Sequence, residues 1–444
     1  MNKSLPCLII AHDFPPFAGG GVMRIHKFVK YLPEFSIKPI VLSINDEYYD
    51  STDYTLFSEY KSFPIIYKTQ TINLKGIYNF FKRKKKTSNI IEIYGVDKTS
   101  KLSKFLDNAS SCFFIPDLKV LWKPFCFRTA EEIIKKYSIK TFISTSPPHS
   151  VQLTGLLLKK KYPYLHWIAD FRDLWTDYKV YTYPFEYVRK IENNMEKKVF
   201  SNADTILCAT EPVRKSFVSK YPELKTEKFI TITNGFDPAD FNSSPEADNA
   251  DIVSTEKKIM NIVYTGSLND WRNLDNFTKA LRILIDKNLI NKKKIRIKLF
   301  GHITYKDSRI ISERDLSDIF ELFGMREHLQ SIVLMKEAHL LLLIIGELEG
   351  AEVMTGKIYE YIGAKRNIFG IVIKDGEAER IIKKYNLGYT ADTSSQENIA
   401  DVFLKAYNDF FSGKFKYSPD QSAYKIFSRY ELTKKLADII KSVN

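Results

Sequence analysis

The sequence predicts an α/β protein of two domains, each built around a parallel sheet. A chain of 444 residues is long for a single hydrophobic core. Short β-rich runs alternate with amphipathic helical stretches, which is the order that parallel sheets with helical crossovers require. A polar stretch near the middle of the chain separates two such series, so we expect one domain on each side of it.

The first series lies in residues 1–235 and forms the N-terminal domain. Its helices are expected in stretches such as MRIHKFVKYL and FRTAEEIIKKY, where apolar residues recur with helical spacing. The segment 46–122 is irregular and rich in Tyr, Lys and Ser, and we interpret it as a partly ordered insertion in this domain. The strands are expected at CLII, KPIVLS, TFIST, HWIAD and TILCAT.

A linker and a second series follow. A strand-like ITI and the turn residues NGFDPADF lead into residues 236–258, which are polar in the way of a linker. Residues 259–420 form the C-terminal domain, and residues 421–444 hold a last helix, YELTKKLADIIKS, which we expect to pack back on the N-terminal domain. The strands of the second domain are expected at MNIVYTG, KIRIKLFG, HLLLLI, NIFGIVI and LGYTA.

The charge of the chain is strongly positive, at +14, and part of it lies in one block, FKRKKKTS, at residues 81–88. Such a block has a plain explanation, since surface lysines often only improve solubility. It is also what attraction to anionic lipid head groups or to nucleic acid requires. No stretch resembles an aromatic and basic RNA-binding motif, so nucleic acid is not an expected partner.

The cysteines and the apolar runs indicate the compartment. Four scattered cysteines show no CxxC pair and no zinc spacing, so we expect buried thiols and neither a disulfide framework nor a structural metal. We see no signal peptide, and the longest apolar run, Leu340 to Ile345, is shorter than the roughly 20 residues that span a bilayer. We expect a cytoplasmic protein that can contact the inner face of the plasma membrane.

Ligands of open α/β sheets bind at the carboxyl ends of strands, so the loops there hold the candidate residues. After CLII, three glycines lead into a helix that begins near Val22, and we select Gly20 and Gly21 as ligand-binding positions. Glycines at a helix start let backbone N–H groups approach an anion. A plain flexible turn is the alternative. The pattern is not GxGxxG, which argues against a nicotinamide dinucleotide.

Charged residues follow a second strand of the N-terminal domain. Asp170 ends HWIAD, and Arg172 and Asp173 come directly after it. A carboxylate there can act as a base, accept a hydrogen bond or pair with an arginine. For Asp173, a surface cluster that caps a helix is an equal alternative. His149, in STSPPHS, is a weaker candidate of the same kind, because exposed loop histidines are usually inert.

Two loops of the C-terminal domain have features that suit phosphate. After MNIVYT, Gly266 allows a tight turn and Arg272 lies six residues further on. A lone arginine is usually a solvated surface charge, but a guanidinium in a strand-to-helix loop can bind phosphate oxygens in a fork. After HLLLLII, the stretch EVMTGKIYE places Glu352 and Glu360 on either side of a predicted helix start, with seven residues between them.

This helix start can bind one elongated ligand. Thr355 is a good N-cap and Gly356 a permissive first residue, and Lys357 adds a positive charge to an N-terminus that already favours phosphate. Glu360 lies one turn further, where a carboxylate can accept both hydroxyls of a ribose. The alternative is a capped helix with a Lys–Glu pair.

The stretch EVMTGKIYEYIGAKRN resembles the donor-site signature of retaining glycosyltransferases of the GT-B fold, in particular glycosyltransferase family 4. Further pieces agree in order along nearly the whole chain: PPFAGGGVMR, IPDLKVLW, STSPPHSVQL, WIADFRDLW, ITNGFDPADF and IVYTGSL. The resemblance implies two Rossmann-like domains that face each other across a cleft, with the nucleotide-sugar bound mainly by the second. It also implies that the last helix crosses back to the N-terminal domain.

The resemblance also implies roles for the selected residues. Glu360 would hold the ribose and Glu352 the donor sugar, while Arg272 and Lys357 would neutralise the diphosphate. Met325 would touch the base through its backbone. The donor site would further include Gly20, Gly21, Gly266, Thr355 and Gly356; the acceptor side would hold His149, Arg172 and Asp173; and the catalytic residues would be Glu352 and Asp170.

Two departures from the family pattern concern the donor site. Ser267 stands where the family commonly has an arginine, and EGAEVMTG replaces an EGFG-like stretch. They put diphosphate affinity and donor choice in question, while the predicted fold is unaffected.

The predicted function is transfer of a sugar, with retention and without a metal or other cofactor, from a nucleotide-sugar to a glycan or lipid-linked acceptor. The expected context is synthesis of a cell-envelope polysaccharide such as capsule, O-antigen, lipopolysaccharide or exopolysaccharide. One alternative is an inactive GT-B scaffold that serves as a binding or partner subunit. The other is a nucleic-acid-binding protein, which the charge suggests but the acids in the strand-end loops do not support.

Overall fold

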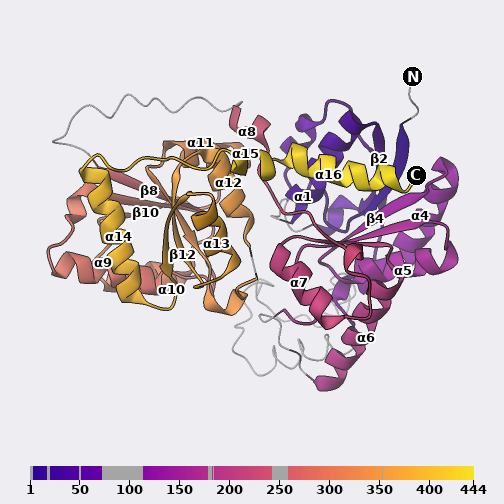
Figure 1. Cartoon of the computed structure of the whole chain (residues 1–444), viewed down its shortest axis with the longest axis horizontal. Helices are drawn as coiled ribbons and strands as arrows, with labels where there is room; N and C mark the ends of the chain where they lie inside the picture. The colour runs from indigo at the N-terminus through magenta and orange to yellow at the C-terminus, as the bar shows by residue number, and fades with distance from the viewer. Residues whose placement is uncertain are drawn as a thin grey trace, which may run out of the picture. The chain divides into compact units, whose positions relative to one another are not determined.

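The computed structural model describes residues 4–17, 21–49, 52–72, 114–178, 183, 185–242, 259–352 and 354–444. The chain forms two compact units (Figure 1). The first comprises Met1–Ile232 together with Thr433–Asn444, and the second comprises Thr233–Leu432. Both are α/β structures with one parallel sheet, as the sequence predicts.

The first unit contains a seven-stranded parallel sheet in the order β3-β2-β1-β4-β5-β6-β7. Register pairs Cys7 of β1 with Pro39 on one side and Thr141 on the other. The chain order therefore reverses between β1 and β4, which is where a doubly wound sheet opens a crevice for ligands. The strands are β1 (Leu5–Ile10), β2 (Ile37–Ile44), β3 (Ile65–Thr69), β4 (Thr141–Ser146), β5 (His166–Phe171), β6 (Thr205–Cys208) and β7 (Phe229–Thr231).

Helices of the first unit pack against a core that contains Trp122, Trp167 and Phe171, each at most 1% exposed. Short 3-10 segments include η3 (Tyr54–Glu59) and η4 (Leu118–Trp122). The α-helices are α1 (Val22–Tyr31), α4 (Lys123–Tyr137), α5 (Ser150–Lys161), α6 (Glu186–Asn202) and α7 (Glu211–Lys220).

Strand β3 differs from the prediction, because its residues belong to the segment that we interpreted as an insertion. It pairs along β2 from Ile40↔Ile65 to Ile44↔Thr69 and forms the edge of the sheet. At the other end of that segment, the Trp122 indole donates to Thr69 Oγ1 (2.6 Å). Both ends of segment 46–122 are thus part of the first unit, and the block at residues 81–88 lies outside the described residues.

The second unit contains a six-stranded parallel sheet in the order β10-β9-β8-β11-β12-β13. Its strands are β8 (Met260–Thr265), β9 (Ile295–Phe300), β10 (Phe320–Leu322), β11 (Leu340–Ile344), β12 (Asn367–Val372) and β13 (Gly388–Asp392). Its helices are α8 (Pro238–Asn242), α9 (Asp275–Asp286), α10 (Tyr305–Glu313), α11 (His328–Glu337), α12 (Gly356–Ala364), α13 (Glu377–Lys384), α14 (Gln396–Phe411) and α15 (Ser422–Ile426), with η8 (Glu347–Glu349) after β11.

Strand β11 shows why the second unit has helices on both faces of its sheet. Its side chains alternate between the faces. Leu340, Leu342 and Ile344 join the core under α9 and α14, whereas Leu341 and Leu343 join the core under α11, α12 and α13. A fully apolar run was therefore needed at this position, and the predicted strand is confirmed.

The region between the units is folded at its start. Phe236 donates its N–H to the Phe427 carbonyl (3.0 Å), and α8 follows, so the first residues of the predicted linker 236–258 pack on the second unit. Residues 243–258 lie outside the described ones.

The last helix, α16 (Arg429–Ser442), carries the chain from the second unit into the first. Its buried residues include Leu436, Ala437 and Ile440, and the Asn444 side chain donates to Thr141 Oγ1 at the start of β4 (2.8 Å).

The thiols of Cys7, Cys126 and Cys208 are free and buried, as predicted, while Cys112 lies outside the described residues. Burial raises the pKa of the Cys7 thiol to about 12, so it stays protonated at neutral pH. Within the described part of the chain, no helix combines the length and the apolar character needed to cross a bilayer.

Candidate ligand site

The start of α12 lies at the carboxyl ends of the strands of the second unit. The helix begins at Gly356 with Thr355 as its N-cap, as predicted. The Thr355 side chain does not cap the helix, and its buried Oγ1 has no hydrogen-bond partner among the residues that the structure describes. A buried hydroxyl in this state needs an explanation. The first turn of α12 has no side-chain cap, so its N–H groups and this hydroxyl are suited to an anionic ligand.

Lys357 is one of the two basic residues of this site, with Arg272. Its Nζ lies 4.3 Å from the centroid of the Tyr264 ring and donates to the Tyr264 hydroxyl (2.7 Å). Burial, and then the charge of Arg272, lower the pKa of Lys357 to about 7, while Glu349 and Glu360 act in the opposite direction. At neutral pH a lysine with this pKa is only partly protonated. An anion that binds beside it raises the pKa, and the lysine then becomes fully charged.

Glycines bring the strand ends together around Lys357. Gly266, after β8, has a φ of +125°, and a Cβ there would lie 2.0 Å from Lys357 Cε. Gly301, after β9, has a φ of +128°, and a Cβ there would lie 2.1 Å from the Gly266 carbonyl oxygen. Its N–H donates to the Gly324 carbonyl (2.7 Å). Position 266 thus requires glycine for two reasons, the close approach of the Lys357 side chain and the positive φ of the backbone.

Arg272 enters the same site from the loop after β8. Its Nε donates to Glu349 Oε2 (3.2 Å), and a second guanidinium nitrogen contacts the other carboxylate oxygen. Glu349 is 5% exposed and also accepts from the Gly346 N–H (2.9 Å). The sequence singled out Arg272 but missed Glu349. The only signal for it was an acid in the loop after a buried strand.

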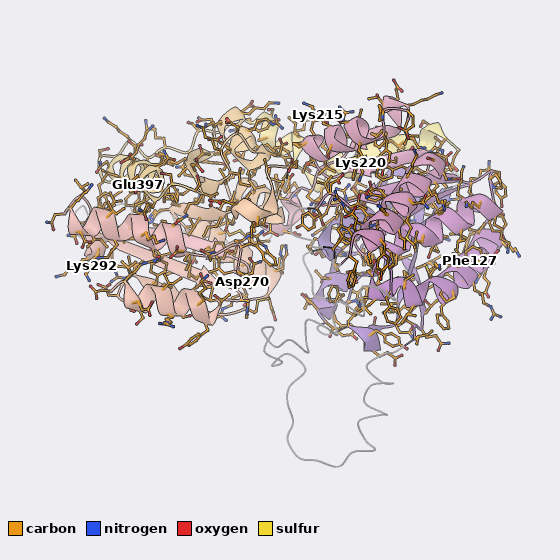
Figure 2. All side chains as sticks on the ribbon, turned by 90° about the horizontal axis from the view of Figure 1, so that it is seen from below. Phe127, Lys215, Lys220, Asp270, Lys292 and Glu397 are labelled. Carbon is orange, nitrogen blue, oxygen red and sulfur yellow. The ribbon has the colours of Figure 1, made fainter. Side chains whose placement is uncertain are left out.

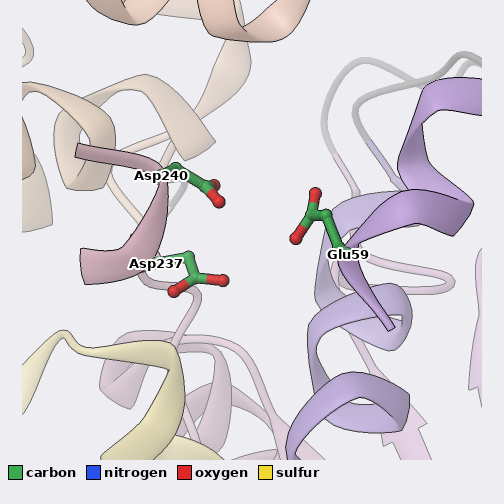
Figure 3. Close-up of side chains that lie close together, drawn as sticks. All are labelled: Glu59, Asp237 and Asp240. Carbon is green, nitrogen blue, oxygen red and sulfur yellow. The ribbon is translucent and has the colours of Figure 1, made fainter. Parts of the chain in front are cut away.

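Glu360 lies one turn into α12 and is half-buried. Its Oε1 is 3.9 Å from His328 Nδ1, and His328 Nε2 lies 3.2 Å from Asp240 Oδ2. Asp240 and Asp237, both at α8, are drawn in Figure 3. Neither His328 nor Asp240 was selected from the sequence, because they are distant from Glu360 along the chain.

The remaining candidates of the second unit lie in loops. Glu352 is half-buried in the turn before α12. Met325 follows β10 and is 71% exposed, next to Gly324 with its φ of +66°. The roles expected for these residues stay predictions.

In the first unit, Asp170 is fully buried and pairs with Arg24, whose guanidinium donates at 2.8 and 3.2 Å. Thr145 Oγ1 also donates to this carboxylate (2.8 Å). Of the three uses considered for Asp170, the structure contains two: the carboxylate pairs with an arginine and accepts a hydrogen bond from Thr145. Its catalytic role stays a prediction. Arg24 was missed because it lies on α1, 146 residues away.

His149 corrects one expectation. The sequence suggested an exposed loop histidine, whereas His149 is the N-cap residue of α5 and is half-buried, with its ring stacked on Trp175 (4.9 Å between centroids). Burial, and then the charge of Arg172, lower its pKa to about 3. His149 is therefore neutral at physiological pH.

Arg172 connects two loops at the carboxyl edge of the first sheet. It donates to the carbonyls of Ser146 (3.2 Å), Pro147 and Gly21. Gly21 is the N-cap residue of α1, and Gly20 lies outside the described residues. Asp173 is half-buried, and its charge favours the protonated form of Arg172. In the described residues the next helix after Asp173 is α6, so Asp173 does not directly precede a helix start. Its role stays a prediction.

Glu59 ends η3 in the first unit and is drawn in Figure 3. Its carboxylate accepts from Lys27 Nζ (2.5 Å) and Lys30 Nζ (2.8 Å) on α1, and it lies 3.2 Å from His26 Nε2. These contacts anchor part of the predicted insertion to the first helix.

Comparison with known proteins gives matches at the level of structure. No protein-family model and no curated protein matches the sequence. A glycosyltransferase from Rickettsia africae is 16% identical with a TM-score of 0.63, over 99% of this chain and 98% of that one. Anabaena HepE in complex with UDP and glucose is 11% identical with a TM-score of 0.65, over 99% and 100%. The lipopolysaccharide outer core galactosyltransferase WaaB is 14% identical with a TM-score of 0.57, over 99% of each chain.

These likenesses extend over both units, and each unit has a Rossmann-like parallel sheet. The chain therefore has the GT-B fold, as the sequence predicts.

Proposed function

We propose that this protein is a glycosyltransferase that binds a nucleoside diphosphate sugar at the start of α12. The observation that carries the proposal is the convergence of Lys357, Arg272 and the uncapped α12 N-terminus around a buried, unpaired hydroxyl of Thr355. Two positive side chains and a helix N-terminus match the charge of a diphosphate. HepE, one of the similar structures, is described with UDP and glucose, so uridine is the first base to test.

The chemistry follows from the same groups. When the bond from the sugar to the diphosphate breaks, negative charge grows on the leaving oxygen, and Lys357 and Arg272 would stabilise it. Glu360, supported by His328, would hold the ribose, and Glu352 the donor sugar. We further propose retention of configuration, as in glycosyltransferase family 4, without a metal, because the two cations can neutralise the diphosphate themselves.

The acceptor that we propose is a glycan or a lipid-linked sugar of a cell-envelope polysaccharide. One of the structures with the same fold, WaaB, is described as a lipopolysaccharide outer core galactosyltransferase, and lipopolysaccharide is a cell-envelope polysaccharide. Product analysis by NMR would give the anomeric configuration, and transfer in excess EDTA would test the independence from metal.

The decisive experiment is a thermal-shift screen against UDP, GDP, ADP, CMP and NAD. A ligand at 100 times its Kd stabilises the folded state by about 2.7 kcal/mol. We expect one nucleoside diphosphate to raise Tm, and Glu360→Ala to remove the shift. Glu397→Ala is the matched control, because Glu397 is an exposed acid of α14 in the same unit (Figure 2). The proposal fails if no nucleotide raises Tm at millimolar concentration.

A second candidate function is an inactive GT-B scaffold, and Ser267 is the observation in its favour. It stands where the related family commonly has a basic residue. A scaffold would keep nucleotide binding but show no release of UDP from UDP-sugars with any acceptor. Ser267→Arg would then increase the affinity for UDP without creating transfer, whereas in an active enzyme it would change the rate.

A further inference from the structure

A cavity of about 200 Å³, with polar and apolar lining, lies in the same unit at the carboxyl ends of β11 and β12. Its floor is apolar and includes Phe277, Ile344 and Ile371. Its polar lining includes Asn273, Asn276, Asp270 and Glu347, and Trp271 forms part of its wall. Asp270, labelled in Figure 2, and Glu347 are exposed, so the cavity is open to solvent.

The cavity is on the other face of the sheet from α12. Ile344 and Ile371 belong to the core under α9 and α14, whereas Ile358 and Ile362 of α12 belong to the core under the opposite face. Asn273 and Asn276 come from the start of α9 and the loop before it. The groups that line the cavity are thus different from those proposed to bind the nucleotide.

The walls of the cavity are fixed before any ligand binds. Gly346 lies so close to the loop before α9 that a Cβ there would be 1.6 Å from the Trp271 carbonyl oxygen. Asn276 Nδ2 donates to the Thr393 carbonyl (2.8 Å), and Asn273 Nδ2 donates to the Asp270 carbonyl (3.0 Å). Preformed walls reduce the ordering cost of binding.

We propose that this cavity binds one neutral sugar ring of a glycan, as a site separate from the nucleotide site. Trp271 is 37% exposed and offers a flat apolar surface with a polar edge, which suits the C–H face of a sugar. The carboxylates of Asp270 and Glu347 can each accept two sugar hydroxyls. The residues that line the cavity include two acids and no lysine or arginine, so a phosphate is disfavoured. The volume is below the roughly 300–1,000 Å³ of pockets for drug-sized ligands, so the cavity suits a single ring better than a whole nucleoside diphosphate sugar.

The tryptophans allow a selective test. The chain has four, and Trp122, Trp167 and Trp175 are at most 2% exposed, so Trp271 is the one at the surface. We would label the full chain with 5-fluorotryptophan, assign the Trp271 ¹⁹F resonance with Trp271→Phe, and titrate methyl glycosides of glucose, galactose, mannose, rhamnose and N-acetylglucosamine. We expect at least one glycoside to shift this resonance alone and to saturate it.

Two variants test the polar contacts. Asp270→Asn combined with Glu347→Gln keeps the shape but removes both charges, and it should weaken binding by roughly tenfold or more. Glu360→Ala, on the other face, should leave the sugar-induced shift unchanged even where it removes nucleotide binding. The proposal is overturned if no glycoside moves the Trp271 resonance, because the cavity then binds no sugar. It is also overturned if methylammonium or inorganic phosphate moves the resonance equally well, because the cavity then binds ligands of a different chemistry.

Discussion

In the proposed donor site, Lys357 would make binding dependent on pH. Its pKa is lowered to about 7 by burial and by Arg272, so the free protein loses the charge as pH rises through 7. A bound diphosphate favours the charged form, so binding above pH 7 takes up a proton. We expect the affinity for UDP-glucose to fall between about pH 6 and 9, and calorimetry in buffers of different ionisation enthalpy would detect the proton.

UDP-glucose suits this measurement because its diphosphate, unlike that of UDP, has no terminal phosphate that titrates near pH 6. Lys357→Arg keeps a charge throughout and should give a nearly flat profile. Lys357→Met should also be flat, but weaker at every pH. A steep profile in either variant would assign the pH dependence to another group.

Gly266 is the residue with the sharpest steric prediction. Gly266→Ala places a Cβ against Lys357 and forces alanine to a φ of +125°. We expect a loss of about 1–3 kcal/mol in the free energy of unfolding and a large loss of nucleotide binding. Gly413→Ala is the control, since Gly413 also has a positive φ but a Cβ there would meet nothing within 4 Å. Both variants would be compared by urea unfolding and nucleotide titration. A loss seen in both variants reports the backbone strain, and a loss seen only in Gly266→Ala reports the clash with Lys357.

At this scale the sequence predicted the groups that lie in one short stretch. Thr355, Lys357 and Glu360 could be placed together by helical spacing alone. The partners could not, because they come from elsewhere in the fold. Glu349 meets Arg272 across 77 residues, and Arg24 meets Asp170 across 146. Such pairs depend on which strands become neighbours, and no local pattern encodes that.

Helix α6 contains a buried acid whose titration should be visible in stability. Glu192 is 3% exposed and accepts from the Trp175 indole N–H (2.8 Å) and the Tyr183 hydroxyl (3.3 Å). Burial, opposed in part by these donors, raises its pKa to about 7. The folded state therefore keeps a proton that the unfolded state loses near pH 4.5. Stability falls as pH rises from about 4.5 to 7 and then levels off.

Glu192→Gln isolates this effect. The variant should match the natural protein near pH 4.5 and exceed it above pH 7, by on the order of 3 kcal/mol. Glu186→Gln, at an exposed acid of the same helix, should not alter the pH dependence. Chemical denaturation at a series of pH values would test this. A constant difference between Glu192→Gln and the natural protein would rule out the titration of Glu192.

Strands could be predicted from the sequence where both of their faces are fully buried. Strands such as β11 and β12 are buried throughout and were found from their runs of Leu, Ile and Phe. Two strands were missed for physical reasons. Every residue of β3 is half-buried, as at a sheet edge, and its sequence IIYKT lies among Tyr and Lys. Strand β10 has only three residues, which is too short for an alternation to register.

At the scale of the whole molecule, the number and order of predicted strands were enough to predict the fold. They were not enough to predict which surface each helix covers. The sequence predicted two α/β series with a boundary near residue 235, and the structure divides the chain after Ile232. The final residues, Thr433–Asn444, join the first unit although they follow the second in the chain. The sequence suggested this packing from the place of the helix beyond a loop, and the resemblance also implied it. The helical pattern alone could not, because an amphipathic helix shows which face is apolar but not which surface it covers.

The net charge of +14 gives the last prediction, which concerns where the protein acts. If the acceptor is lipid-linked, the protein must reach an anionic membrane surface, and basic residues near such a surface contribute about 1 kcal/mol each. We expect binding to phosphatidylserine vesicles that falls with salt and weakens when the lysines and arginine of block 81–88 are changed to glutamine. The same number of substitutions at the lysines of 292–294 and 434–435 is the control. Stronger binding to RNA than to vesicles, with a steep salt slope, would favour the nucleic-acid alternative instead.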